Sequence, residues 1–119
     1  AKKTNNFNLA LNRPAESSSN EAAGLDGQHV TDKDIDSRWS SNWAANKDNH
    51  PEYVYVDLGK SYDISDVKVL WDNAYAKGYK VQTCTSDPED DNRWETAATV
   101  NDSEGGLQDS SFDSTKARY

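Results

Sequence analysis

The sequence predicts an all-β domain, either a sandwich or a barrel. Short runs of alternating apolar and polar residues recur along the chain, and a period of two indicates strands with one buried face. Turn-forming residues separate these runs, and no stretch keeps a helical period beyond about two turns. Several short strands at even spacing are typical of sandwiches and barrels.

Five runs carry this alternation. In the second run, for example, Val67, Val69 and Trp71 share one face. The five predicted strands are 53–58, 67–72, 79–84, 94–100 and, with a weaker pattern, 107–112. Turns are predicted between them at 57–60, 86–88 and 104–106, where glycine, proline and aspartate gather.

The length and charge of the chain limit its class. Its 119 residues predict one domain with a modest core, preceded by a polar linker or frayed terminus at residues 1–7. The net charge of −8 disfavours nucleic acid and anionic membranes as partners. This charge serves solubility, or it attracts a cationic partner or metal ions. No signal peptide is visible, which fits an intracellular chain or a mature or excised fragment.

The single cysteine, Cys84, excludes an internal disulfide. A cysteine nucleophile needs a nearby base, and neither His29 nor His50 forms a recognisable motif with it. We therefore interpret Cys84 as a small, buried strand residue.

The stretch 25–43, which reads LDGQHVTDKDIDSRWSSNW, predicts an ordered loop that carries binding residues. Side chains rich in oxygen suit a hard cation such as calcium. Here they are Asp26, Gln28, Thr31, Asp32, Asp34, Asp36 and Ser37. The alternating aspartates do not complete a helix–loop–helix calcium motif, because Ser37 stands at the glycine position and Trp43 at the glutamate position. The loop is therefore either a different kind of calcium site or a solvated acidic loop.

The tryptophans divide into two groups. Trp39, Trp71 and Trp94 lie in or beside strand runs, and we interpret them as core residues. Trp43 lies in a polar loop, where an indole is a candidate platform for a sugar ring. Arg38 precedes it, and a guanidinium donates hydrogen bonds in a fixed fork that suits a ring rich in hydroxyls.

Two carboxylates outside the loop are also candidates. Glu21 follows the serine-rich stretch 17–20, and Asp72 ends the second strand run. As a pair they are either the acid and base of a glycosidase or acceptors for sugar hydroxyls or an amino group. We prefer the binding role because it requires no fixed separation and no shifted pKa.

Short motifs from residue 8 onward follow one another in the order of a known family. They are Asn8-Leu9-Ala10-Leu11-Asn12-Arg13-Pro14-Ala15, Ser17-Ser18-Ser19-Asn20-Glu21, Leu25-Asp26-Gly27, Ser37-Arg38-Trp39-Ser40-Ser41, Val56-Asp57-Leu58-Gly59-Lys60, Val67-Lys68-Val69-Leu70-Trp71, Tyr75-Ala76-Lys77-Gly78-Tyr79-Lys80-Val81-Gln82 and Ala117-Arg118-Tyr119. Together they resemble the discoidin domain, also called the coagulation factor V/VIII type C domain, in the bacterial branch of family 32 carbohydrate-binding modules.

The resemblance implies a jelly-roll β-sandwich over residues 8–119, with a structural calcium and a sugar site in the loops at one end. By position, it places the calcium ligands at the carbonyl of Ala23, at Asp26, in the Gln28 region and at Ser37. It places the sugar contacts at Glu21, Arg38, Trp43 and Asp72. The sugar-contact positions are among the residues selected above on chemical grounds.

The chain departs from the family pattern in two places. The segment 29–35 lengthens the gap between the Asp-Gly turn and the Arg-Trp pair and adds acidic residues. The family also continues beyond Ala117-Arg118-Tyr119 with a further strand and a calcium-binding glutamate. The resemblance therefore implies a C-terminally incomplete domain, whose last strand or strands are missing and whose sheet has an unpaired edge.

The expected function is non-catalytic binding of an oligosaccharide or polysaccharide. The resemblance implies an extracellular, bacterial module that targets an attached glycoside-active enzyme, and we expect a monomer. A neutral galactose- or glucose-type sugar or an amino sugar suits the predicted site better than a uronate, which the carboxylates would repel. One alternative is a catalytic glycoside hydrolase fragment. The other is a lipid or protein adhesion domain, which the acidic loops disfavour.

Overall fold

The computed structural model describes residues 8–34, 36–42, 52–73 and 75–119. Within these ranges the regular structure consists of strands and two short 3-10 turns, and no described helix is long and apolar enough to cross a membrane. The chain divides into two compact units, Ala1–Leu58 and Gly59–Tyr119. They are called the N-terminal unit and the C-terminal unit below, and each is described by itself.

The N-terminal unit contains the short strands β1 (Ala15–Ser17) and β2 (Val54–Val56), which pair antiparallel. The 3-10 turn η1 (Gly27–Val30) contacts β1. A Cβ at Gly27 would lie 3.2 Å from Cβ of Ser17, which is tighter than most Cβ contacts, so a larger residue would require β1 to move slightly. The packing of Gly27 on β1 therefore fixes where the loop after η1 starts.

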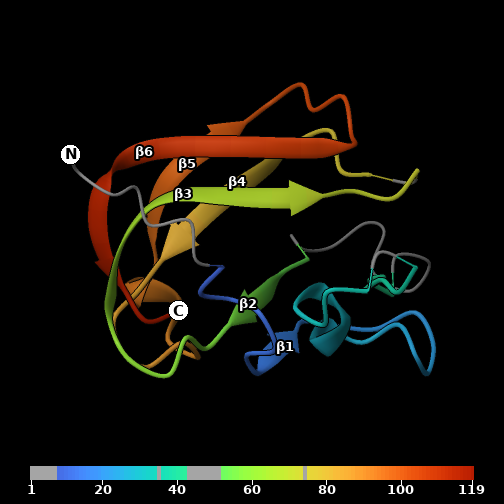
Figure 1. Cartoon of the computed structure of the whole chain (residues 1–119), viewed down its shortest axis with the longest axis horizontal. Coiled ribbons are helices and arrows are strands. Elements are labelled where there is room, and N and C mark those ends of the chain that lie inside the picture. Colours follow the sequence, from blue (N-terminus) through green and yellow to red (C-terminus); the bar gives the residue numbers. More distant parts are fainter. Residues whose placement is uncertain (1–7, 35, 43–51, 74) are drawn as a thin grey trace. The chain divides into compact units, whose positions relative to one another are not determined.

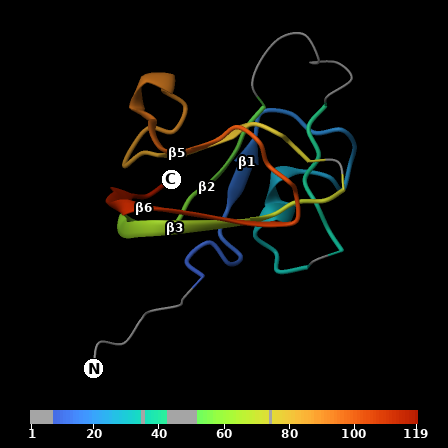
Figure 2. The ribbon, with the colours of Figure 1, turned by 90° about the horizontal axis from the view of Figure 1, so that it is seen from above.

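The C-terminal unit is built from two antiparallel pairs of strands. The strands β3 (Tyr62–Leu70) and β6 (Leu107–Ala117) lie side by side in both ribbon views (Figure 1, Figure 2). The strands β4 (Tyr79–Thr83) and β5 (Glu95–Val100) form the other pair, and the 3-10 turn η2 (Asp91–Arg93) precedes β5. β6 also contacts β4 and β5, and it bends strongly along its length (Figure 1).

Burial along these strands follows the predicted alternation. On β3, Val67 and Val69 are half-buried, whereas Asp66 and Lys68 are exposed. The predicted turns are also present: Gly59, Asp87, Gly105 and Gly106 all adopt positive φ values. The all-β prediction is confirmed for the described residues, although β3 begins earlier and β6 ends later than expected.

Cys84 is buried, as predicted, but it directly follows β4 instead of lying in the strand. It is 5% exposed, and burial raises the pKa of its thiol. Its backbone amide donates to the carbonyl of Tyr119 at 3.1 Å. Cys84 and Ala117 are buried apolar residues of the C-terminal unit. Leu58 is buried in the N-terminal unit.

The three tryptophans assigned to the core are half-buried rather than fully buried. Trp71 packs on Tyr79 with ring centroids 5.1 Å apart, and Nε1 of Trp94 donates to the carbonyl of Pro88 at 2.9 Å. Nε1 of Trp71 is buried and has no hydrogen-bond partner among the described residues. Partial burial is common for this large amphipathic side chain.

Candidate functional site

Two loops of the N-terminal unit are joined at Glu21. Its backbone amide donates to the carbonyl of Ser40 at 2.8 Å, and Oγ of Ser40 donates to Oε2 of Glu21 at 2.6 Å. The second bond orients a carboxylate that is nevertheless exposed. Glu21 is therefore bonded to Ser40, which lies two residues after Arg38 in the sequence.

Trp39 and Asn42 strengthen this junction. Nε1 of Trp39 donates to the carbonyl of Ser19 at 2.9 Å, and the amide of Asn42 donates to Oγ of Ser19, also at 2.9 Å. Ser19 in turn donates to the carboxylate of Glu52 at 2.9 Å, and Ser18 bonds the same carboxylate. The side chains of Ser18 and Ser19 thus connect three segments of this unit.

The structure brings together part of the predicted sugar site. Glu21 and Arg38 are both exposed on the joined loops of the N-terminal unit. Trp43 lies outside the described residues. Asp72 belongs to the C-terminal unit, where it follows β3, is exposed, and accepts from the amide of Asn73 at 2.8 Å. Its carboxylate is thus oriented by the backbone of its own loop.

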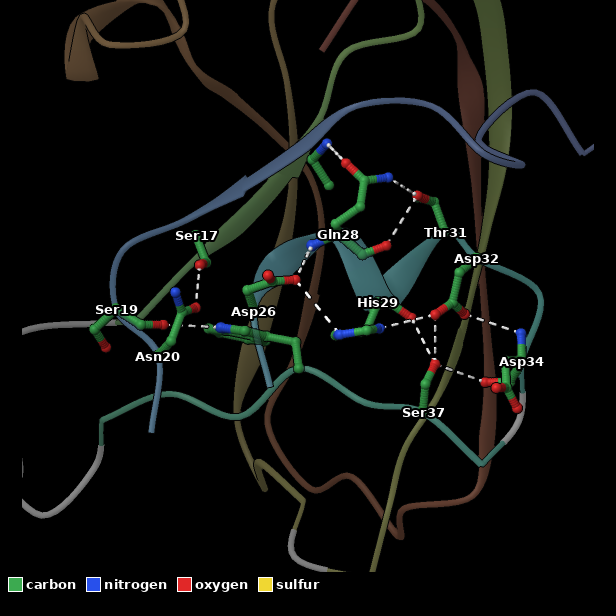
Figure 3. A network of polar contacts seen from close by, with 12 residues as sticks. Ser17, Ser19, Asn20, Asp26, Gln28, His29, Thr31, Asp32, Asp34 and Ser37 are labelled. Atoms are coloured by element: carbon green, nitrogen blue, oxygen red, sulfur yellow. Dashed lines mark hydrogen bonds and ion pairs between the residues drawn. The ribbon is translucent and has the colours of Figure 1, made fainter. Parts of the chain in front are cut away.

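The loop around η1 is held by Asp26 and Gln28 (Figure 3). Oδ1 of Asp26 caps η1 by accepting from the amide of Gln28 at 3.2 Å. The side-chain amide of Gln28 accepts from the amide of Ala15 at 3.2 Å and donates to the carbonyl of Arg13 at 2.9 Å. It also donates to Oγ1 of Thr31 at 3.1 Å. Gln28 is therefore a structural bridge between η1 and the segment that leads into β1.

His29 lies between two aspartates in the same loop (Figure 3). Its Nδ1 is 2.9 Å from Oδ2 of Asp32, and its Nε2 is 3.7 Å from Oδ1 of Asp26. The hydrogen bond with Asp32 raises the pKa of the imidazole, and the nearby carboxylates favour its charged form further. When His29 is protonated, its positive charge lies beside the carboxylates of Asp26 and Asp32 and balances part of the negative charge of the loop.

Asp32 is the centre of the rest of the loop. Oγ of Ser37 donates to its Oδ2 at 2.6 Å, and the amide of Asp34 donates to its Oδ1 at 2.9 Å. These bonds, with the one from His29, lower the pKa of Asp32 to about 2. Asp32 is therefore held by the side chains of His29 and Ser37 and by the backbone of Asp34.

The predicted calcium ligands differ in how well they fit an ion. The carboxylate of Asp26 and the carbonyl of Ala23 belong to exposed residues and suit a hard cation. The side-chain amide of Gln28 and the hydroxyl of Ser37 are already engaged within the loop. Within the described ranges, no group of three or more histidine, cysteine or acidic side chains converges on one point. An ion at this position would therefore depend on backbone carbonyls beside Asp26.

The chain was then compared with known proteins. The model of the F5/F8 type C family, described as a NedA-like, galactose-binding domain, matches residues 29–119, and the chain belongs to this family. The predicted discoidin resemblance is thereby confirmed. None of the curated protein sequences matches the chain significantly.

Solved structures agree with the family assignment. Chitosan-binding module 2 of a chitosanase/glucanase from Paenibacillus sp. IK-5, solved with chitotriose, is 32% identical, with a TM-score of 0.83 over 93% of this chain and 82% of that one. Module 1 of the same enzyme is 33% identical, with a TM-score of 0.83 over 94% of this chain and 81% of that one.

A more distant structure shows the fold alone. The family 32 carbohydrate-binding module of NanJ from C. perfringens, solved with galactose, is 17% identical, with a TM-score of 0.67 over 90% of this chain and 77% of that one. The predicted β-sandwich of galactose-binding type is confirmed by these structures.

Proposed function

We propose that this domain is a non-catalytic carbohydrate-binding module that binds an amino-sugar glycan of the chitosan class. The main support is the similarity to the two Paenibacillus chitosan-binding modules, which extends over more than nine-tenths of this chain. Those modules belong to a chitosanase/glucanase, so the domain is proposed to target an attached glycoside-active enzyme to its polysaccharide. A family 32 module of a secreted bacterial enzyme fits this role.

The proposed site lies on the joined loops of the N-terminal unit, with Glu21 and Arg38 as its described residues and Trp43 as a further proposed contact. The carboxylate of Glu21 is exposed and oriented by Ser40, so it presents an acceptor to a ligand without a further ordering cost. Arg38 supplies donors for ring hydroxyls, and Trp43 supplies an apolar ring face. A sugar with a free amine gains a charge-assisted hydrogen bond to a carboxylate, which a neutral sugar lacks.

The net charge of −8 also favours an amino sugar over an acidic one. The negative charge attracts a polycationic glycan at separations up to about the Debye length, and it repels a uronate. Neutral and amino sugars both fit the hydroxyl contacts, but only an amino sugar pairs its charge with a carboxylate.

A comparison of chitotriose with cellotriose tests the proposal, because the two trisaccharides share a linkage and differ by amine in place of hydroxyl. We expect tighter binding of chitotriose by isothermal titration calorimetry, with an affinity that falls as salt rises, because exposed charge pairs are screened within about 8–10 Å at physiological ionic strength. Cellotriose binding should hardly respond to salt.

Equal affinity for the two trisaccharides would contradict the amino-sugar assignment. Tight binding of oligogalacturonate at low salt would contradict the placement of Glu21 in the site. Release of sugar from any of these oligosaccharides would contradict the non-catalytic role.

We also propose a structural calcium ion beside Asp26. The support is the donor chemistry of Asp26 and the Ala23 carbonyl, together with the position of the loop next to the joined loops of the sugar site. The ion would stabilise the folded loop and take no part in sugar chemistry.

A further inference from the structure

Both pairs of strands in the C-terminal unit lose their regular register once. In the β4–β5 pair, Val81 faces Ala98 and Gln82 faces Thr96, so that Ala97 is an extra residue on β5. In the β3–β6 pair, Ile64 faces Thr115 and Asp66 faces Ser111, so residues 112–114 of β6 face the single residue 65 of β3. Each irregularity is a β-bulge, which turns side chains away from the positions of a regular strand.

The two bulges open onto the same cavity. It has a volume of about 260 Å³ and is lined by Thr83, Glu95, Thr96, Ala97, Phe112, Asp113 and Thr115. Successive residues of a regular strand point to opposite faces, yet the neighbours Phe112 and Asp113 both line this cavity. The bulges are what allow this, so the cavity is a feature of the fold rather than a chance gap between side chains.

The lining combines apolar side chains with hydroxyl and carboxylate groups. Phe112 and Ala97 are half-buried, and Thr83 is only 7% exposed. Oγ1 of Thr96 already accepts from Nε2 of Gln82 at 3.1 Å, so its hydroxyl hydrogen is available to another acceptor. The cavity therefore offers a ring face and hydroxyl groups together, as ligand sites usually do.

Two carboxylates, those of Glu95 and Asp113, stand at the rim and are exposed. Within the described part of the chain, neither takes part in a hydrogen bond or an ion pair. The cavity thus presents two negative charges without a protein cation to balance them. A ligand that carries a positive charge and several hydroxyls would satisfy all of these groups.

We propose that this cavity is a second binding site for one amino-sugar unit, formed by the β5 and β6 bulges. Its volume lies just below the range of about 300–1,000 Å³ typical of ligand pockets, which fits one ring rather than an oligosaccharide. Glu95 and Asp113 would hold the ammonium group, the threonines the ring hydroxyls, and Phe112 an apolar ring face. The choice of an amino sugar as the ligand rests on the proposed function. The location of the second site does not, because none of these residues belongs to the first site.

Titration of the isotope-labelled protein with glucosamine, followed by NMR, tests the proposal. We expect backbone amide shifts at residues 96–98 and 112–115, separate from those around Glu21 and Ser40. The double variant Glu95→Gln and Asp113→Asn should weaken the binding reported by the bulge amides by about tenfold or more, because charged hydrogen bonds are lost. Both side chains are exposed, and a melting curve checks that the variant folds.

The matched control is Asp91→Asn with Asp102→Asn, which removes two exposed carboxylates of the same unit outside the cavity. It should leave the bulge shifts unchanged. An absence of shifts at the bulges, or shifts of equal size with glucose, would overturn the second site. Shifts at the bulges without any around Glu21 would support the second site and count against the proposed first site, so the two ideas fail separately.

Discussion

Ser40 donates to the carboxylate of Glu21 at 2.6 Å, and the backbone of Glu21 donates to Ser40 in return. This reciprocal contact joins the serine-rich loop to the loop that contains Arg38. A carboxylate that is exposed and still oriented is suited to meet a ligand amine.

We therefore predict that Glu21→Gln weakens chitotriose binding by about tenfold, because a charge-assisted hydrogen bond becomes a neutral one. Calorimetric titration measures the affinity. The matched control is Glu16→Gln on β1, which removes the same charge from an exposed residue of the same unit and should leave the affinity almost unchanged. Equal losses in both variants would mean that net charge, and not Glu21, drives binding.

Trp43 and Trp39 should respond differently to substitution. We predict that Trp43→Ala weakens sugar binding by roughly fivefold to tenfold and leaves the melting temperature unchanged, since it removes a stacking surface. Trp39→Phe should instead lower the stability by about 1 kcal/mol, because it removes the hydrogen bond to the Ser19 carbonyl. Thermal melts and calorimetry separate the two effects, and a large drop in melting temperature for Trp43→Ala would place that residue in the core.

The strands were predictable where alternation is uninterrupted. β4 and β5 agree with their predicted runs to within a residue at each end. The second half of β6 was missed because its bulge breaks the period and residues 113–116 are polar. β1 was missed because a strand of three residues is too short to show a period.

The site was predictable only in its residue types. The chemistry of Glu21 and Arg38 is visible in the sequence, but their arrangement depends on contacts such as Trp39 with Ser19, twenty residues apart. No periodicity encodes such contacts. The role of His29 as the partner of Asp32 was likewise missed. The two residues are three positions apart, and this spacing is a local signal that could have indicated the contact.

We predict that calcium raises the melting temperature and that a chelator lowers it, because an ion that binds only the folded state stabilises that state. Asp26→Asn should abolish this difference. Asparagine caps a helical turn about as well as aspartate, so the variant removes the charged ligand while it keeps the cap of η1. Scanning calorimetry in calcium and in chelator measures the effect, and identical curves for the natural domain would show that the loop holds no ion.

A pair of carboxylates on the C-terminal unit predicts a specific pH dependence. Asp109 shares a hydrogen bond with Asp66, which raises the pKa of Asp109 and lowers that of Asp66. A raised pKa in the folded state contributes stability below the unfolded value of about 3.9, and that contribution is lost as pH rises through the folded value. At neutral pH both groups are charged and repel each other.

We therefore predict that Asp109→Asn is more stable than the natural chain at pH 7 and loses the decline in stability as pH rises from about 4. Asparagine can still donate to Asp66 without a second charge. Chemical denaturation over a pH series measures this, with Asp102→Asn as a control for net charge. If the free energy of unfolding changed with pH in the same way for the natural chain and for Asp109→Asn, the hydrogen bond between Asp109 and Asp66 would be contradicted.

The last prediction concerns the turn before β6, where two adjacent glycines form a matched pair. Gly105 and Gly106 both adopt positive φ, of 74° and 64°. A methyl group at Gly105 would lie 2.6 Å from Cδ1 of Tyr75, whereas nothing lies within 4 Å of one at Gly106. Gly106→Ala should therefore cost about 1–2 kcal/mol from backbone strain alone.

Gly105→Ala should cost about 1–3 kcal/mol more, because the Tyr75 ring must move or the turn must open. Denaturant unfolding of both variants measures the difference. Repeating the comparison in a Tyr75→Ala background removes the ring, so that the two glycine substitutions should then cost the same. If Gly105→Ala stays more costly without the ring, the strain lies in the backbone, and Tyr75 does not pack on Gly105 in solution.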